Sequence, residues 1–363
     1  MIDRFEAFLE KIESKINFKE HDAFLVTSIN NRFYFSGLFT SDGLVLITKK
    51  KIYFLVDFRY YELARRQTKG IDVILVESFF DTLGDLINKL SIKNLYLESK
   101  DITLFKFNFL KSALGSLDVN LIFNDILSET IEELRCVKNE SEIKKIATAQ
   151  EISEFTFNYI LTKIKPGISE KKIADEIEYF IKKNGAKSTS FDTIVLSGKN
   201  SSLPHGLPTD KKVEIGDFIT IDMGAVFEGY RSDMTRTVVL GKVTDEQRQV
   251  YETVKKAQKI AETEVKAGVS CAYLDNLARD YIYSQGFEGK FGHALGHGVG
   301  IDIHERPVVS KKSDAVLAKD MVITIEPGIY IEDKFGVRIE DMLRVEQNGY
   351  YNFTKLTKDL IIL

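Results

Sequence analysis

Four short motifs of this chain carry five acidic or imidazole side chains of the types that bind divalent metal ions. These side chains are Asp222, Asp233, His297, Glu326 and Glu340. Four of the 5 histidines fall between residues 203 and 305. Histidine is a common metal ligand and the side chain that exchanges protons near neutral pH. This concentration indicates a reactive site, although histidine positions alone leave chance clustering open.

The acids lie in apolar surroundings, which is the reason to expect metal ions beside them. Asp222 and Glu326 each follow apolar residues in a strand-like run, and an unpaired carboxylate is costly to bury there. Converging carboxylates would also raise one another's pKa values, and cations remove that repulsion. Two divalent ions would match the charge of the four acids. Four carboxylates and one imidazole favour manganese or cobalt, with zinc or iron as further possibilities.

Other catalytic patterns fit less well. His304 and Glu305 begin like a zinc-binding H-E-x-x-H helix, but Val308 replaces the second histidine. No serine lies in a G-x-S-x-G pattern. The glycines around His297 could form a flexible loop or a phosphate cradle, but they lack G-x-G-x-x-G spacing. We expect instead that they let the backbone approach closely and turn the imidazole inward.

Composition limits the remaining classes. The chain has 363 residues, 44% hydrophobic and 29% charged, with a formal net charge of -4. No concentrated basic patch for nucleic acid is present, and no apolar run reaches the length of a membrane span. Two cysteines suit a reducing compartment, and the start of the chain lacks the pattern of a signal peptide. A cytoplasmic protein with no nucleic-acid or membrane partner is expected.

The organisation predicts an α+β protein with two domains. Residues 1–127 alternate strand and helix patterns, which predicts a smaller α/β domain. Helices are expected at 2–16, 60–67, 79–90 and 102–114, and strands at 23–27, 44–48, 52–56, 73–76, 95–97 and 121–123. A polar stretch at 128–138 is expected as a linker.

Residues 139–363 are predicted to form the catalytic domain from two similar halves. Helices are expected at 139–165, 169–185, 244–268 and 270–286, followed in each half by strands that carry two acids. The interval from residue 140 to Asp222 equals that from Thr244 to Glu326. Thr244 and Gln247 form a capping-box pattern. This layout predicts a duplication with helices outside and acids on the inner strands, although coincidence remains an alternative.

The motifs resemble those of the Xaa-Pro peptidases with the pita-bread fold, the family of prolidase and aminopeptidase P. The resemblance spans about residues 135–350, and the first domain resembles the smaller domain of these enzymes more weakly. The motifs are Pro204-His205-Gly206, Asp222-Met223-Gly224, Tyr230-Arg231-Ser232-Asp233, His293-Ala294-Leu295-Gly296-His297, His304-Glu305-Arg306-Pro307, Glu326-Pro327-Gly328 and Gly336-Val337-Arg338-Ile339-Glu340.

The resemblance implies two divalent metal ions and a ligand set. Asp233 and Glu340 would bridge both ions, Asp222 would complete one shell, and His297 with Glu326 the other. Two ions about 3.5–4 Å apart share a water and lower its pKa, which gives a hydroxide for attack on the carbonyl before proline. Glu326 is the candidate for proton transfer.

Four further side chains complete the expected site. His293 and His304 would stabilise the intermediate and shuttle protons, and His205 would contact the prolyl end. Arg338 should share a face with Glu340 and support the ligands or the substrate carboxylate; a structural ion pair is the alternative. Gly328 and Tyr330 are candidate walls for the proline ring.

These expectations favour an Xaa-Pro dipeptidase whose substrate is a small peptide with proline in second position. Aminopeptidase P, which acts on longer peptides, shares the ligands and remains the main alternative. A catalytically silent binding protein would have replaced ligands, and methionine aminopeptidase usually lacks the first domain. The resemblance also implies a homodimer.

Overall fold

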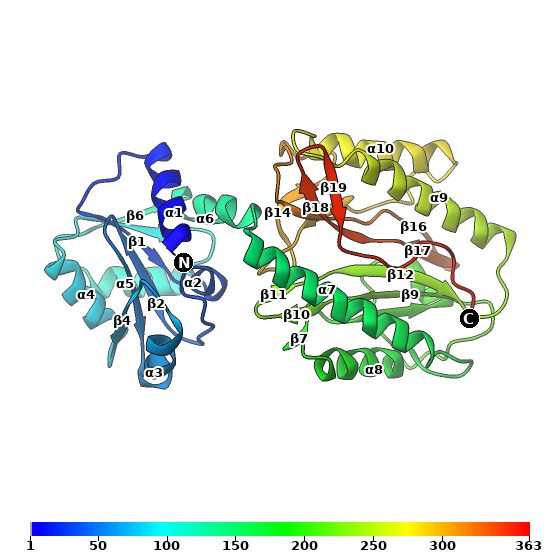
Figure 1. The fold of residues 1–363 in the computed structure, drawn as a ribbon, viewed down its shortest axis with the longest axis horizontal. Coiled ribbons are helices and arrows are strands. Elements are labelled where there is room, and N and C mark those ends of the chain that lie inside the picture. Colours follow the sequence, from blue (N-terminus) through cyan, green and yellow to red (C-terminus); the bar gives the residue numbers. More distant parts are fainter. Residues whose placement is uncertain (1) are drawn as a thin grey trace. The chain divides into compact units, whose positions relative to one another are not determined.

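The computed structural model describes residues 2–363, with side chains from Arg4 onward. It divides into two compact units, Met1–Leu134 and Arg135–Leu363. Figure 1 shows the order of the elements along the chain. In the described part of the chain, no helix has the length and apolar character needed to cross a membrane.

The first unit is a six-stranded mixed sheet with helices on both faces. The strand order is β4-β3-β2-β1-β5-β6; β2 is antiparallel to β1 and β3, and the other pairs are parallel. The elements are α1 (Ile2–Lys15), β1 (Asp22–Val26), α2 (Ile29–Ser36), β2 (Leu44–Thr48), β3 (Ile52–Val56), α3 (Phe58–Gln67), β4 (Asp72–Leu75), α4 (Phe79–Lys89), β5 (Asn94–Glu98), α5 (Leu104–Ala113), β6 (Asn120–Asn124) and α6 (Ile126–Cys136).

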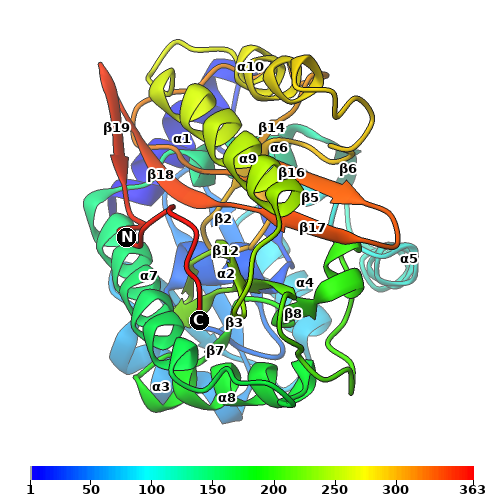
Figure 2. The ribbon, with the colours of Figure 1, turned by 90° about the vertical axis from the view of Figure 1, so that its right-hand side faces the viewer.

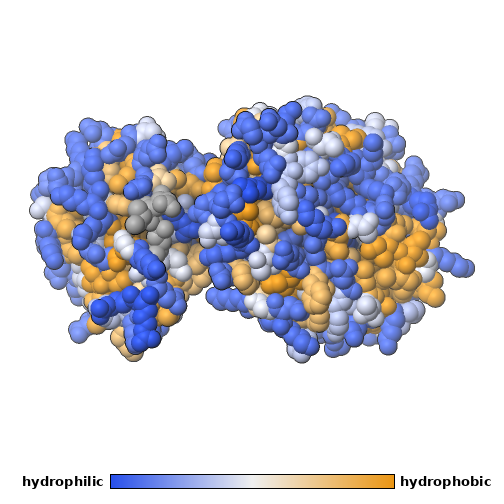
Figure 3. Space-filling model, in the orientation of Figure 1, coloured by the Kyte–Doolittle hydropathy of each residue, from blue (hydrophilic) through white to orange (hydrophobic). Residues whose placement is uncertain are grey.

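Alternation along β1 explains the two covered faces. Ala23 and Leu25 belong to the core that includes side chains of α4 and α5. Phe24 points the other way, and its ring centroid lies 5.2 Å from that of Phe8 in α1. Figure 3 shows apolar side chains on the visible surface as well, and α5 leaves Phe105 78% exposed. The predicted α/β domain is therefore observed, with α2 and α6 as helices that the pattern did not indicate.

Most of the segment expected as a linker, residues 128–138, is helical. Helix α6 covers it as far as Cys136. Leu127 and Ile131, one helical turn apart, are both fully buried. The position of the domain boundary within this segment stays a prediction.

The second unit places strands between two pairs of helices. In Figure 2, α7 and α8 lie on one side of the strands and α9 and α10 on the other. The elements are α7 (Glu140–Leu161), α8 (Glu170–Lys183), β7 (Ser188–Thr189), β8 (Ile194–Ser197), the short 3-10 helix η1 (Gly198–Ser202), β9 (Phe218–Met223), β10 (Ala225–Phe227), β11 (Tyr230–Arg231), β12 (Met234–Val239), α9 (Asp245–Thr263), α10 (Cys271–Ser284), β13 (Gly296–Gly298), β14 (Glu305–Val309), β15 (Val322–Ile325), β16 (Gly328–Ile331), β17 (Phe335–Arg338), β18 (Asp341–Glu346) and β19 (Gly349–Asn352).

The two halves of this unit repeat one layout, as the sequence predicted. In each half a pair of helices precedes an antiparallel strand pair, β9 with β12 and β15 with β18. The first helix of each half begins with a capping box, at Asn139 with Glu142 and at Thr244 with Gln247. The fold is therefore the expected α+β arrangement with a pseudo-twofold pita-bread domain.

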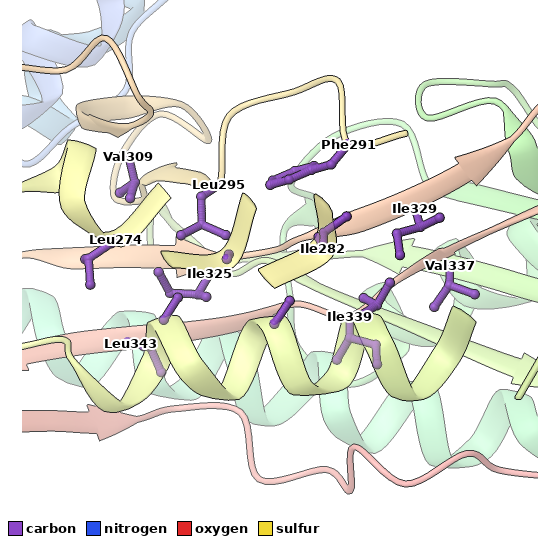
Figure 4. Close-up of a cluster of buried hydrophobic side chains, with 14 of the residues drawn as sticks. Leu274, Ile282, Phe291, Leu295, Val309, Ile325, Ile329, Val337, Ile339 and Leu343 are labelled. Atoms are coloured by element: carbon purple, nitrogen blue, oxygen red, sulfur yellow. The ribbon is translucent and has the colours of Figure 1, made fainter. Parts of the chain in front are cut away.

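Strand alternation sends the apolar residues to the helices and the acids to the space between the halves. Ile219 and Ile221 belong to the core that includes residues of α7 and α8. Ile325 belongs to the core of the other half, which Figure 4 shows in close-up. Asp222 and Glu326 follow these residues directly, so each points away from its helix layer.

Candidate metal centre

The five predicted ligand residues come together from five different strands or strand ends of the second unit. Asp222 lies on β9, Asp233 lies directly before β12, and His297 is the middle residue of β13. Glu326 follows β15 and Glu340 precedes β18. Each of the five residues lies in a strand or directly beside one. The repeated layout of the two halves therefore brings equivalent acids, such as Asp222 and Glu326, toward the same space.

Short distances join these residues. One ligand atom each of Asp233, His297 and Glu340 lies within 4.8 Å of the others. His297 Nε2 lies 3.5 Å from Asp233 Oδ2 and 3.3 Å from Glu326 Oε1. Asp222 acts electrostatically on Asp233 and Glu340, which places it in the same cluster.

Two carboxylate oxygens of the cluster have no partner in the described structure. They are Asp222 Oδ1 and Glu340 Oε1, and both are buried. Buried carboxylate oxygens are normally satisfied by donors, so an unsatisfied one needs a physical reason. Cations beside the cluster would satisfy both atoms. The residues present therefore fit divalent metal ions.

The pKa shifts within the cluster also indicate that it can bind cations. Burial and the neighbouring carboxylates hold the pKa values of Asp233 and Glu340 well above the usual range. Burial opposes charge on His297, but Glu326 and Asp233 outweigh it and raise its pKa to about 9. In the protein without metal, bound protons thus offset the negative charge of the acids, and bound cations would replace those protons.

The glycines beside His297 are required by close backbone contacts, as predicted. A Cβ on Gly296 would lie 2.0 Å from Thr324 O, and one on Gly298 would lie 2.2 Å from Arg306 O. The His297 ring nitrogen Nδ1 lies 3.1 Å from Gly298 O, which can only accept. Nδ1 therefore carries the hydrogen in the neutral ring, and Nε2 faces the acids with its lone pair.

Two threonines support the acids and were not identified from the sequence. Thr235 Oγ1 donates to Glu340 Oε2 at 2.7 Å. Thr324 Oγ1 donates to Glu326 Oε1 at 3.1 Å and accepts from His297 N at 3.1 Å. The available signal was the two-residue period of a strand, which places Thr324 on the face of Glu326.

Arg338 connects the acids to Tyr330 and His293. Its Nη2 donates to Asp222 Oδ2 at 2.7 Å, and its Nη1 donates to Tyr330 Oη at 2.9 Å. His293 Nδ1 lies 2.8 Å from Ala294 O and must donate there, so Nε2 accepts from Tyr330 Oη at 3.0 Å. Tyr330, expected only as a pocket wall, is a hydrogen-bonded member of the site.

His304 and His205 are the exposed members of the predicted set. The His304 ring lies edge-on to His297, with centroids 4.4 Å apart. The His304 ring is only partly covered, but that partial burial and the charge of His297 lower its pKa, and His205 adds a smaller effect. His205 lies on the loop after η1. Among the described residues, its ring forms no hydrogen bond or ion pair with the five predicted ligands.

Two family descriptions cover most of the chain. Metallopeptidase family M24 matches residues 144–347, and the Creatinase/Prolidase N-terminal domain matches residues 9–137. An Xaa-Pro dipeptidase from Pyrococcus horikoshii is 37% identical over 357 residues, which is 97% of this chain and 99% of that protein.

Solved structures share the whole fold. An Xaa-Pro dipeptidase from Bacillus anthracis superimposes with a TM-score of 0.93 at 39% identity, covering 99% of this chain and 100% of the other. An X-Pro aminopeptidase from Thermotoga maritima gives a TM-score of 0.89, also at 39% identity, covering 97% and 100%.

Proposed function

Because the chain belongs to metallopeptidase family M24 and carries the N-terminal domain of creatinase and prolidase, we propose that it hydrolyses the peptide bond before proline. One observation carries the proposal. Carboxylates from both halves of the second unit converge on His297 and leave two buried oxygens without hydrogen-bond partners among the described residues. That arrangement supports a pair of divalent ions rather than a purely structural cluster.

The proposed ligands are the five residues predicted from the sequence. Asp233 and Glu340, whose ligand atoms lie within 4.8 Å of each other and of His297, would bind both ions. Asp222 would bind one ion through its free oxygen, and His297 with Glu326 would bind the other. This oxygen-rich set favours manganese or cobalt. When bound, such ions lower the pKa of water and polarise a carbonyl oxygen.

Glu326 and the histidines supply the proton transfers in this proposal. Glu326 would hold the proton of the attacking water, because its carboxylate is ionised and can accept a proton. Burial opposes that charge, but the contact with His297 outweighs burial and lowers the pKa of Glu326 to about 2. His304 is neutral near pH 7, since burial and His297 lower its pKa, so its N–H can donate to the developing oxyanion. His293 would move protons through Tyr330, to which it is bonded.

The prolyl side of the substrate would meet His205 and Tyr330. The amide before proline has no N–H, so peptidases that use that donor bind it poorly. A surface that accepts the ring is needed instead. Gly328 lies against the Tyr330 hydroxyl, where a Cβ would be 2.5 Å away, which leaves Tyr330 as the candidate wall. Arg338 donates to the Tyr330 hydroxyl and would support a terminal carboxylate through it.

We propose dipeptides as the preferred substrates, with longer Xaa-Pro peptides as the second candidate. The second candidate is favoured by the Thermotoga maritima aminopeptidase, which is as similar in sequence as the Bacillus anthracis dipeptidase. Hydrolysis of Xaa-Pro and Xaa-Pro-Yaa-Yaa peptides should be compared by kcat/KM after loading with manganese or cobalt. Faster turnover of the longer peptide would identify the chain as an aminopeptidase P.

Peptide cleavage, metal content and sedimentation separate the remaining possibilities. A Met-Ala peptide cut in preference to a prolyl peptide would indicate methionine aminopeptidase activity. Dialysed protein without transition metal, and without activation by manganese or cobalt, would indicate a silent binding protein. A homodimer is also proposed, and sedimentation of the protein across a range of concentrations tests it.

A further inference from the structure

The loop that carries His205 is held at both ends by one buried carboxylate. Glu170 is 0% exposed at the first turn of α8. Its Oε1 accepts from Ser197 N at 2.6 Å and from Ser197 Oγ at 2.9 Å. Its Oε2 accepts from Thr209 N at 2.9 Å and from Thr209 Oγ1 at 2.7 Å. The two oxygens thus bind residues on opposite ends of the loop.

Further contacts complete this clamp. Asn200 Nδ2 lies 3.2 Å from both oxygens of Glu170. The N-terminus of α8 holds the returning chain as well, since Lys171 N donates to Thr209 O at 3.1 Å and Glu170 N donates to Lys211 O at 3.1 Å.

The clamped loop lies directly against the strand that carries Arg338. Ser201 Oγ accepts from Gly336 N at 2.9 Å. A Cβ on Gly336 would lie 2.2 Å from Ser201 O, so only glycine allows this approach. Farther along the loop, Arg338 Nη1 donates to Pro204 O at 3.2 Å. His205 therefore directly follows Pro204, which is hydrogen-bonded to Arg338 of the candidate site.

We propose that Glu170 is a positioning residue that fixes the loop of residues 198–208 and thereby sets where His205 meets the substrate. This inference rests on the proposed function for the role of His205. The tip of the loop is exposed, with Leu203 at 54% and Leu207 at 67%, so the tip itself has little packing to hold it. The hydrogen bonds of Glu170 at the two ends of the loop therefore restrict the positions that the tip can adopt.

The test replaces Glu170 by glutamine, which keeps the volume and removes one acceptor. Hydrogen exchange of residues 198–208 should become faster in Glu170→Gln than in the wild type. Hydrolysis of an Xaa-Pro dipeptide should fall by about tenfold or more in kcat/KM, because small displacements of positioning groups are costly. Bound metal should stay unchanged.

A double-mutant cycle with His205→Ala separates positioning from a general loss of structure. Once His205 is absent, Glu170→Gln should cause no further loss in kcat/KM. Glu142→Gln is the matched control, because Glu142 is also a buried acid in a first helical turn, and it binds Asn139 N and Tyr230 Oη instead. The control should not change exchange at 198–208.

Unchanged exchange at 198–208 in Glu170→Gln would overturn the inference. An equal loss of kcat/KM with and without His205 would also overturn it, because the effect would not pass through that ring. If the wild type cut no Xaa-Pro peptide, the proposed function would fail, whereas the exchange comparison would still decide whether Glu170 holds the loop.

Discussion

Arg338 and Asp222 form a buried ion pair in which Nη2 donates to Oδ2 at 2.7 Å. The other oxygen of Asp222, Oδ1, has no partner in the described structure. The guanidinium therefore fixes one side of the carboxylate and leaves the other side open to a cation. The ion pair expected as the alternative for Arg338 is present, and its support of a metal site stays a prediction.

Replacing Arg338 by lysine should weaken metal binding and activity together. A single ammonium group cannot bind Asp222, Tyr330 and Pro204 O at once, as the planar guanidinium does. Loss of such a supporting contact commonly lowers metal affinity or activity by about 10–100-fold. Calorimetric titration with manganese measures the affinity. Arg344→Lys, a change at an ion pair with Asp320, should leave affinity unchanged; equal affinities in both variants would contradict the account.

Thr235→Val should loosen Glu340 without changing the size of the side chain. The threonine hydroxyl donates to Glu340 Oε2 and accepts from Arg338 Nε at 3.1 Å. We expect about 10–100-fold weaker metal binding, measured by competition with a chelator. Thr253→Val removes another buried hydroxyl, in α9, and should leave chelator resistance as in the wild type. A wild-type result for Thr235→Val would mean that Glu340 needs no such support.

Gly296→Ala should disturb β13 because the added Cβ meets backbone. The clash with Thr324 O at 2.0 Å cannot be relieved by turning a side chain. Overpacking of this kind costs about 1–3 kcal/mol, and the shift would move His297 as well. Urea unfolding and bound metal measure the two effects. Gly349→Ala, where a Cβ meets nothing within 4 Å, is the control, and similar losses in both variants would contradict the prediction.

The buried acid Glu305 should stabilise the protein in a pH-dependent way. Burial opposes its charge, but Lys138 and Arg135 outweigh burial and hold the pKa of Glu305 below the usual value of 4.5. An acid with a lowered folded pKa stabilises above its unfolded pKa and loses that effect as the pH falls through the folded value.

Unfolding of Glu305→Gln at several pH values tests this sign. The variant should be less stable than the wild type by about 3–5 kcal/mol at pH 7, because it removes the acid paired with Lys138 and one of the two acids paired with Arg135. The difference should shrink below about pH 4.5. Glu62→Gln, at an exposed pair with Arg66, should show no such trend. A difference that grows on acidification would show that the sign is wrong.

The sequence predicts those features that depend on local pattern. Helix starts at Asn139 and Thr244 were readable because their caps satisfy backbone N–H groups within a few residues. The candidate acids could be identified because a carboxylate inside an apolar strand is costly to bury unless a cation or a donor compensates it. The same alternation predicted that Arg338 shares a face with Glu340, and both side chains contact Thr235 Oγ1.

Contacts between distant segments could not be predicted from local sequence pattern. His297 lies on a strand of three residues, which is too short for a periodic signal. Glu170 has the sequence context of an ordinary helix start, and its loop contacts depend on how the chain returns at Thr209. Tyr330 was recognised only as an aromatic near a turn. Its hydrogen bond to Arg338 depends on the pairing of β16 with β17, and its hydrogen bond to His293 joins residues 37 positions apart.

The most direct test of the account is metal content and Xaa-Pro hydrolysis of Asp233→Asn beside the wild type. After manganese loading and dialysis, the wild type should retain two ions per chain and cut the dipeptide. The variant should lose at least one ion and nearly all hydrolysis, because a neutral amide cannot replace a carboxylate shared by two cations. A variant that keeps both ions and its activity would contradict the central claim that the converging acids hold the metal pair.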